Sequence, residues 1–117
     1  MHTLITNDVE ETSISKNRQS IKTGRRVAEE SLPNLISLYS KFDVKSTFYF
    51  TGIFAKRHPE SVQIVKDHGH EVGCHGYSHH ERHAFDTMPP SQQQSHLILA
   101  KRTIEEIAGR IETFRAP

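Results

Sequence analysis

This 117-residue chain has only one cysteine, no long apolar run and almost no excess of charge of either sign. The single cysteine, Cys74, cannot form a disulfide within the chain and is compatible with a reducing compartment. No apolar run approaches the roughly 20 residues that are needed to span a bilayer. Lysine and arginine number 15 against 14 aspartates and glutamates, so no basic surface favours nucleic acid or an anionic membrane.

The same absences bear on location and domain count. Met1 leads directly into a strand-like segment, without the charged and then apolar stretches of a secretory leader. We therefore expect a soluble, cytoplasmic protein with no membrane span. The length suits one domain over residues 1–117, or a piece of one.

Histidine is the residue that the chain has in abundance. Nine are present, and four of them lie in the short stretch HEVGCHGYSHH, residues 70–80. Loop histidines that face solvent are the simplest explanation for an isolated H-x-x-x-H pair such as His75 and His79. The meaning of the stretch therefore depends on the element that carries it.

Hydrophobic patterning predicts alternating strands and helices. Short β-branched or aromatic runs predict strands, and periodic apolar positions bounded by proline or glycine predict helices. The polar stretch 12–26 has no periodicity and predicts a surface loop, and Ser91 with Gln94 predicts a capping box. The predicted strands are 2–7, 45–52, 70–74 and 112–117, and the predicted helices are 32–41, 59–68 and 91–108.

This alternation predicts an α/β fold with about four parallel strands and three crossover helices. The carboxyl ends of parallel strands share one edge, where ligands bind in such folds. Asp8, Glu10, His75, His79 and Arg115 all fall at that edge. Two imidazoles with one or two carboxylates are ligands that zinc prefers, and three protein ligands leave a position open for catalysis.

Each of these residues also has a simpler interpretation. Asp8 can be a turn residue, Glu10 and Glu11 a solvated acidic run, and Arg115 a surface cation. The aromatic run 48–50 predicts core residues.

The remaining histidines and the cysteine are expected to lie outside the site. Strand alternation turns Cys74 away from it as a small buried hydrophobe. His70 would begin its strand at the opposite edge, and we expect His80 and His83 to be solvated or supporting.

Four segments resemble the polysaccharide deacetylase family, also called carbohydrate esterase family 4, in its N-terminal portion. They are TNDVE (6–10), KSTFYFTG (45–52), GHEVGCHGYSHH (69–80) and FRAP (114–117). The resemblance implies a partial, distorted (β/α) barrel and a divalent metal, with zinc as the preferred ion. It also implies hydrolysis of N-acetyl groups on an amino-sugar polymer or glycoconjugate.

The resemblance also assigns roles. His75 and His79 match the metal-binding histidine motif, with Gly76 in place of a small hydroxyl residue that would support the loop. Arg115 matches the arginine motif, which orients the catalytic base. The first motif departs from T-F-D-D, so we expect Asp8 to be the base and Glu10 the metal ligand, with Asp8 as the alternative ligand.

A backbone N–H between Tyr77 and His79 is expected to help hold the oxyanion of the reaction. The general acid of the family comes from a motif later than FRAP, so we expect the 117-residue chain by itself to be inactive. An open barrel edge makes self-association possible. Two alternatives stay open: a non-catalytic module that binds metal and carbohydrate, and a hydrolase of another non-peptide amide, such as a cyclic ureide.

Overall fold

The computed structural model describes residues 2–13, 18–79 and 84–117. Its main sheet has three parallel strands in the order β1 (Thr6–Val9), β4 (Thr47–Phe50) and β5 (Glu71–Cys74). The register pairs Asp8 with Tyr49 and Tyr49 with Gly73. The predicted α/β class, with parallel strands joined by helices, is confirmed.

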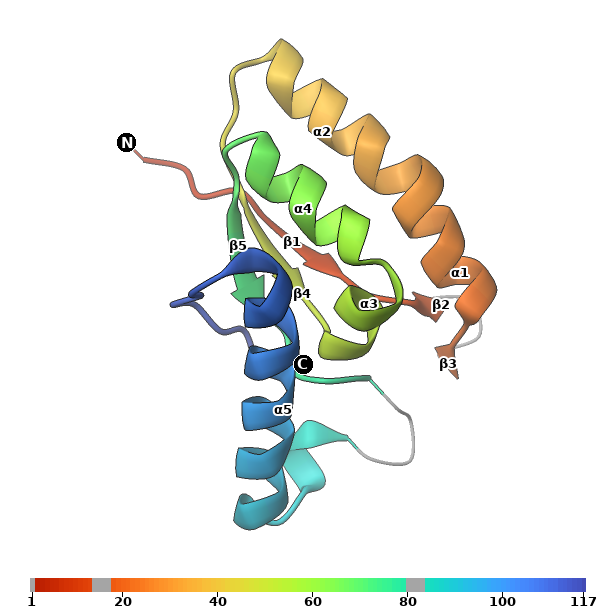
Figure 1. The fold of residues 1–117 in the computed structure, drawn as a ribbon, viewed down its shortest axis with the longest axis vertical. Helices are drawn as coiled ribbons and strands as arrows, with labels where there is room; N and C mark the ends of the chain where they lie inside the picture. Colours follow the sequence, from red (N-terminus) through yellow and green to blue (C-terminus); the bar gives the residue numbers. More distant parts are fainter. Residues whose placement is uncertain (1, 14–17, 80–83) are drawn as a thin grey trace.

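Helices connect the strands and lie along one side of the sheet (Figure 1). An antiparallel pair of two-residue strands follows β1, and the chain then enters a long helical stretch whose middle is π-helical. The remaining elements are β2 (Thr12–Ser13), β3 (Arg18–Gln19), α1 (Ile21–Arg26), the π-helical segment η1 (Val27–Ser31), α2 (Leu32–Lys41), α3 (Gly52–Arg57), α4 (Pro59–Asp67), the 3-10 turn η2 (Phe85–Thr87) and α5 (Pro90–Ala108).

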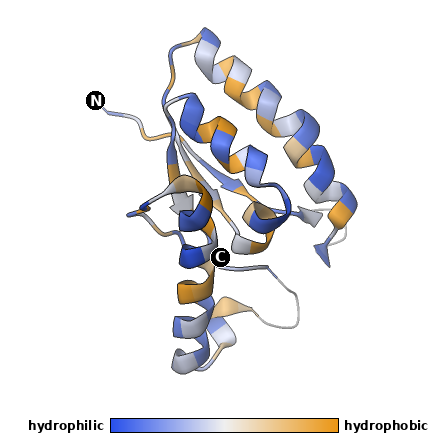
Figure 2. Cartoon of the chain, viewed as in Figure 1, coloured by the Kyte–Doolittle hydropathy of each residue, from blue (hydrophilic) through white to orange (hydrophobic). Residues whose placement is uncertain are grey.

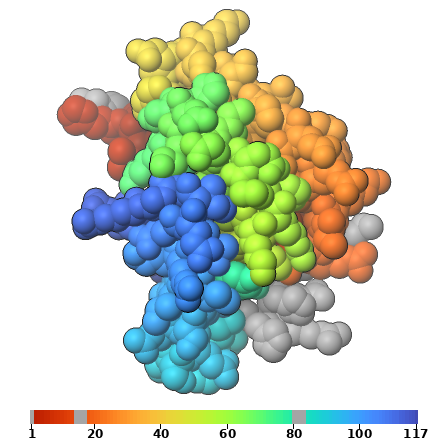
Figure 3. Space-filling view, viewed as in Figure 1, coloured from red at the N-terminus to blue at the C-terminus, as the bar shows by residue number. Residues whose placement is uncertain are grey.

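The core lies between the sheet and the helices. Phe48 and Phe50 of β4 are fully buried, and Val65 of α4 and Ile104 of α5 are buried with them. In Figure 2 apolar and polar residues alternate along α2, α4 and α5, as expected for helices with one buried face. Figure 3 shows these three helices side by side across the molecule, where they hide most of the sheet.

The opposite face of the sheet is polar and more open. Residues of β1 and β4 that alternate with the core positions are exposed or half-buried there, and Gly73 of β5 is covered by Tyr49. Tyr49 belongs to this face, with the guanidinium carbon of Arg115 4.6 Å from its ring centre. The prediction that the whole run 48–50 is core was therefore wrong for Tyr49.

The first and last predicted strands differ from the structure in extent. β1 begins four residues later than predicted, because its start is set by pairing with β4, and Leu4 is 92% exposed. Asp8 consequently lies within the strand. The segment 112–117, predicted as a fourth strand, forms only a one-residue parallel bridge beside β5, Phe114 with Cys74.

Two further local predictions were wrong. Part of the stretch 12–26 forms β2, β3 and α1, and Ser20 caps α1 by accepting a hydrogen bond from the Thr23 N–H. Ser91 does not cap α5, because Pro90 already occupies the first helical turn, where its fixed φ is favourable. None of the described helices has the length and apolarity needed to cross a bilayer.

Candidate active site

Three predicted metal ligands come together at the carboxyl ends of the strands. Glu10 follows β1, and His75 and His79 lie in the loop that follows β5. One potential ligand atom from each residue lies within 4.8 Å of the others. Glu10 is more than sixty residues from the two histidines in sequence, and the parallel topology is what joins them.

The tautomer of His75 is set by its backbone partner. Its Nδ1 lies 2.9 Å from the carbonyl oxygen of Arg115. A carbonyl can only accept, so Nδ1 carries a proton, and in the neutral ring Nε2 is the nitrogen with the lone pair. The ring is 3% exposed, so its orientation is fixed by burial as well. A histidine held in this way is suited to metal binding through Nε2.

Glu10 and His79 contact each other without satisfying all their polar atoms. Glu10 Oε2 contacts His79 Nδ1, whereas His79 Nε2 is buried with no hydrogen-bond partner among the described residues. Burial raises the pKa of the Glu10 carboxyl, but interactions with His79 and His75 outweigh this, and the pKa lies below its usual value. An anionic carboxylate beside two imidazoles, with a polar atom left over, fits a divalent cation.

Asp8 and Arg115 form a second pair beside this group. Arg115 Nη1 donates to Asp8 Oδ1 over 2.7 Å, and its Nη2 donates to the Thr6 hydroxyl. The other oxygen of Asp8 lies 3.8 Å from His75 Nε2. Asp8 is thus held by a cation on one side and faces the histidine group on the other.

The placement separates the two carboxylates that the sequence left ambiguous. Glu10 groups with both histidines, whereas Asp8 pairs with Arg115. This arrangement is consistent with Glu10 as ligand and Asp8 as base. The roles themselves stay predictions.

The comparisons with known proteins bear on this arrangement. Residues 7–117 match the family model for polysaccharide deacetylase. The chain belongs to the polysaccharide deacetylase family. The peptidoglycan deacetylase of Helicobacter pylori is 30% identical over 93 residues, which are 80% of this chain and 31% of that protein. The chain therefore spans about a third of the length of this relative.

Solved structures agree on the fold. The Bc1960 peptidoglycan N-acetylglucosamine deacetylase superposes with a TM-score of 0.75 at 21% identity, over 97% of this chain and 45% of that one. The allantoinase Puue has a TM-score of 0.76 at 18% identity, over 95% of this chain and 44% of that one. At these identities the likeness shows the fold, a distorted (β/α) barrel of which this chain forms a part.

The loop that carries the two histidines is fixed from α3 and α5. The N–H groups of Gly52 and Ile53, at the start of α3, donate to the carbonyls of Gly76 and Tyr77, each over 2.9 Å. The Tyr77 N–H donates to Nε2 of His96 over 2.7 Å. The Tyr77 N–H is therefore already used and is not free to hold an oxyanion, as the sequence had suggested it could be.

Gly76 lets Pro117 and His96 lie close to the backbone of this loop. Its φ of +74° lies in the left-handed region, which favours glycine. A Cβ added there would lie 2.9 Å from Pro117 Cγ and 3.1 Å from His96 Nε2. The side-chain support that a hydroxyl residue would give at position 76 is absent, and His96 holds the loop from the other side.

Glu11 is the acidic residue that the sequence placed wrongly. It is 1% exposed and forms an ion pair with Arg57 at the end of α3, instead of lying in a solvated acidic run. Its Cβ lies 2.9 Å from the Cβ position of Gly24, so α1 packs closely on it. Glu11 thus ties the exit of β1 to α1 and α3, while its neighbour Glu10 faces the histidines.

The other residues singled out in the sequence lie away from the site. His70 precedes β5 and is buried at the opposite end of the sheet, as predicted. His80 and His83 lie outside the described residues. Cys74 is 4% exposed, as predicted for a small buried hydrophobe, and burial raises the pKa of its thiol.

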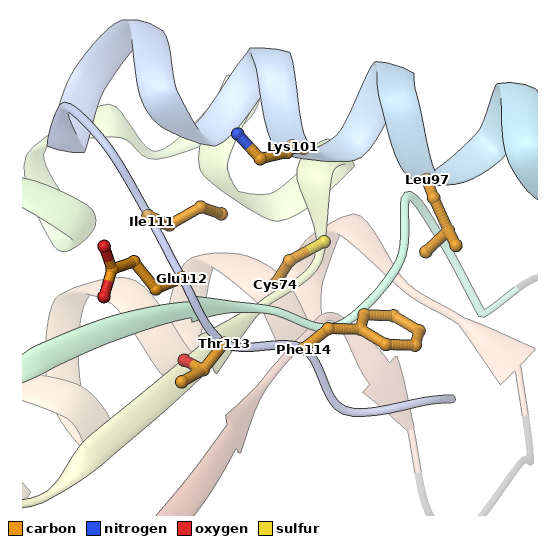
Figure 4. A pocket seen from close by; sticks show the side chains of 7 residues that line it. All are labelled: Cys74, Leu97, Lys101, Ile111, Glu112, Thr113 and Phe114. Atoms are coloured by element: carbon orange, nitrogen blue, oxygen red, sulfur yellow. The ribbon is translucent and has the colours of Figure 1, made fainter.

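Cys74 borders an apolar cavity of about 250 Å³ between α5 and residues 111–114 (Figure 4). Leu97 and Phe114 line the cavity from its two walls. The strand register places Cys74 beside the core residue Phe50, on the helix-covered face of the sheet. The cavity includes none of the five predicted site residues and is separate from the site.

Proposed function

We propose that this protein hydrolyses N-acetyl groups on an amino-sugar polymer or glycoconjugate with a divalent metal, zinc being the preferred ion. One observation carries the proposal. A carboxylate and two imidazoles converge at the strand ends, and a second carboxylate, held by an arginine, lies directly beside them. Family membership adds the reaction class, and because the chain spans about a third of its Helicobacter pylori relative, the activity is a proposal.

Glu10, His75 and His79 would hold the metal. When bound, a divalent ion supplies Lewis acidity toward a carbonyl oxygen and toward water. Zinc suits this donor set, because it accepts nitrogen and carboxylate ligands and tolerates three protein ligands. The proton on His75 Nδ1, fixed by the Arg115 carbonyl, leaves Nε2 available as a donor atom.

Asp8 is proposed to accept the proton of the attacking water. Its carboxylate faces His75, and Arg115 fixes its orientation through Oδ1 and leaves Oδ2 on the side of the ligand group. Thr6 and Tyr49 in turn hold the guanidinium of Arg115 in place. General base catalysis needs this kind of fixed geometry within reach of the water.

The leaving amine also needs a proton. In the family its donor comes from a motif later than FRAP, and for this reason we predict little acetate release from the 117-residue chain alone. The substrate to test first is peptidoglycan, because the Helicobacter pylori relative is a peptidoglycan deacetylase and Bc1960 is a peptidoglycan N-acetylglucosamine deacetylase.

Two measurements test the proposal together. Zinc is titrated calorimetrically into the metal-stripped 117-residue chain, with His79→Ala as the matched variant. Acetate release from peptidoglycan and from N-acetylglucosamine oligomers is then measured for this chain and for a longer protein that contains it. We expect one zinc site that is lost in the variant, and zinc-dependent acetate release by the longer protein.

Other outcomes point elsewhere. Zinc and saccharide binding without acetate release by the longer protein would indicate the non-catalytic module. Hydrolysis of a cyclic ureide in place of the acetamides would indicate the other alternative, a hydrolase of another non-peptide amide. A folded chain without any zinc site would contradict the proposed centre.

Location and self-association are independent of this reaction. A cytoplasmic location stays a proposal, tested by cell fractionation. Among the described residues, β1 pairs only with β4 in the main sheet, so its other edge has free backbone groups for a second copy. Light scattering across a concentration series would show whether the chain associates through it.

A further inference from the structure

His96 is a half-buried residue of α5 that takes no part in the reaction proposed above. Its Nε2 lies 2.7 Å from the backbone nitrogen of Tyr77, which sits between His75 and His79 in the chain. The ring is half-buried and packs against the rings of Tyr77 and Phe85, at 6.2 and 5.6 Å between centres. The contact thus joins α5 to the middle of the histidine loop.

The direction of this hydrogen bond defines the state of the ring. A backbone N–H can only donate, so Nε2 is the acceptor and the proton of the neutral ring is on Nδ1. Burial lowers the pKa of His96, and the charge of His79 lowers it further, so the neutral ring is favoured. The neutral ring is the form that can accept from Tyr77.

The loop has little else on this side to hold it. Gly76 is in the left-handed region and has no side chain, and a Cβ there would lie only 3.1 Å from His96 Nε2. On the other side the carbonyls of Gly76 and Tyr77 accept from the start of α3. The backbone between the two histidines is therefore bonded from both sides, and among the described residues it is His96 that accepts from the Tyr77 N–H.

We propose that His96 is a positioning residue of the metal centre, which accepts the Tyr77 amide and so fixes the relative placement of His75 and His79. This inference rests on the proposed function, because it assumes that those two histidines bind the metal. Groups that orient metal ligands typically change metal affinity by about 10- to 100-fold when they are removed.

The test compares two substitutions in the full 117-residue chain. His96→Leu replaces the ring with an apolar side chain of similar bulk, which has no acceptor for the Tyr77 N–H. His96→Gln has an amide oxygen that can accept from the Tyr77 N–H. His68→Leu is the control, because His68 is an exposed histidine at the end of α4, far from the loop in the topology.

Two readouts are measured for each variant. Zinc affinity is measured by calorimetry, and protection of the Tyr77 amide is measured by hydrogen exchange in the metal-free chain. We expect His96→Leu to bind zinc about 10- to 100-fold more weakly and to lose the protection. We expect His96→Gln to restore both, and His68→Leu to change neither.

A third measurement needs no substitution and covers the case in which His96→Leu does not fold. Nitrogen-15 spectra of the unchanged chain should show His96 with Nδ1 protonated and Nε2 unprotonated. A proton on Nε2 would overturn the proposal, as would unchanged zinc affinity or unchanged Tyr77 protection in a folded His96→Leu variant.

The outcomes separate this inference from the metal centre itself. Tight zinc binding by both the unchanged chain and His96→Leu removes the role of His96 and leaves the centre standing. No zinc binding by the unchanged, folded chain removes the centre, and the positioning role with it.

Discussion

A buried histidine lies at each end of β5, and the two rings are used in opposite ways. His70 precedes the strand, and its Nδ1 accepts a hydrogen bond from the Ser46 N–H over 3.3 Å. His75 follows the strand, and its Nδ1 donates to the Arg115 carbonyl. The backbone partner is a donor in one case and an acceptor in the other, so the two neutral rings have opposite tautomers.

The polar groups around the two histidines also differ. At the start of the strands the polar groups bond to one another: Tyr39 donates to Asn7, Asn7 to Ser46, and Ser46 to the Ile5 carbonyl, over 2.7 to 2.9 Å. His70 Nε2 has no hydrogen-bond partner among the described residues, but the ring packs on those of Tyr39 and Phe48.

At the ends of the strands the polar groups are left open instead. The buried Nε2 of His79 has no hydrogen-bond partner in the part of the chain that the structure describes. A closed network stabilises the fold, whereas an open one costs stability and suits a ligand. The histidines on either side of β5 therefore differ in their surroundings: aromatic rings pack on His70, whereas a carboxylate and a second imidazole lie beside His75.

The largest expected effect is on the reaction itself. Asp8→Asn keeps the shape of the side chain but removes the base, so acetate release by an active protein that contains this chain should fall about 10²- to 10⁴-fold. Zinc affinity should change little, since Asp8 is paired with Arg115. Calorimetry on Glu10→Gln is the matched measurement, and loss of zinc in Asp8→Asn but not in Glu10→Gln would reverse the two roles.

The second effect contrasts the two histidines directly. His75→Ala removes a proposed ligand, and its zinc affinity should fall by more than the roughly 10- to 100-fold typical of a supporting residue. His70→Leu should leave the zinc affinity unchanged, because its ring lies at the other end of β5. Calorimetry on both variants at one pH measures this. Equal losses of zinc affinity would mean that the two ends of the sheet are not independent.

The third effect is on stability, and here the larger change is expected from His70. His70→Leu leaves the buried Ser46 N–H without an acceptor, which should lower the free energy of unfolding by about 1–3 kcal/mol. Urea denaturation followed by circular dichroism measures it, with His68→Leu as the control for loss of an exposed histidine. An unchanged denaturation midpoint in His70→Leu would show that the Ser46 contact contributes nothing to stability.

Much of this arrangement could be predicted because it depends on local patterns. The apolar periodicity of α2 and the β-branched and aromatic run of β4 identified their elements, and parallel topology then brought Glu10 to His75 and His79. Strand alternation also placed Cys74 away from the site. In each case the signal lies within a few residues of the element itself.

The parts that were missed depend on contacts between distant positions. His96 has no motif of its own and gains its place from the packing of α5 against the histidine loop. Glu11 differs from Glu10 only in the direction in which its side chain leaves the strand end, where Arg57 meets it. The true start of β1 was likewise set by pairing with β4 and not by composition.

The smallest effect is the pH dependence of stability that His70 brings. Burial lowers the pKa of His70 below its usual 6.5, and the charges of Lys45 and His68 lower it further. As pH falls, His70 is therefore protonated at a higher pH in the unfolded chain than in the folded chain. The stabilisation from neutral His70 is complete above about pH 6.5 and is lost toward the folded pKa, with a slope of at most about 1.4 kcal/mol per pH unit.

His70→Gln removes the titrating group and keeps an oxygen that can accept from the Ser46 N–H. Urea denaturation between about pH 8 and pH 5 should therefore give a flatter curve for this variant than for the unchanged chain. Some slope should remain, because burial lowers the pKa of His96 as well. Identical slopes for the two chains would mean that His70 keeps its ordinary pKa in the fold. The contrast between the ends of β5 would then rest on the hydrogen bonds of the two rings alone.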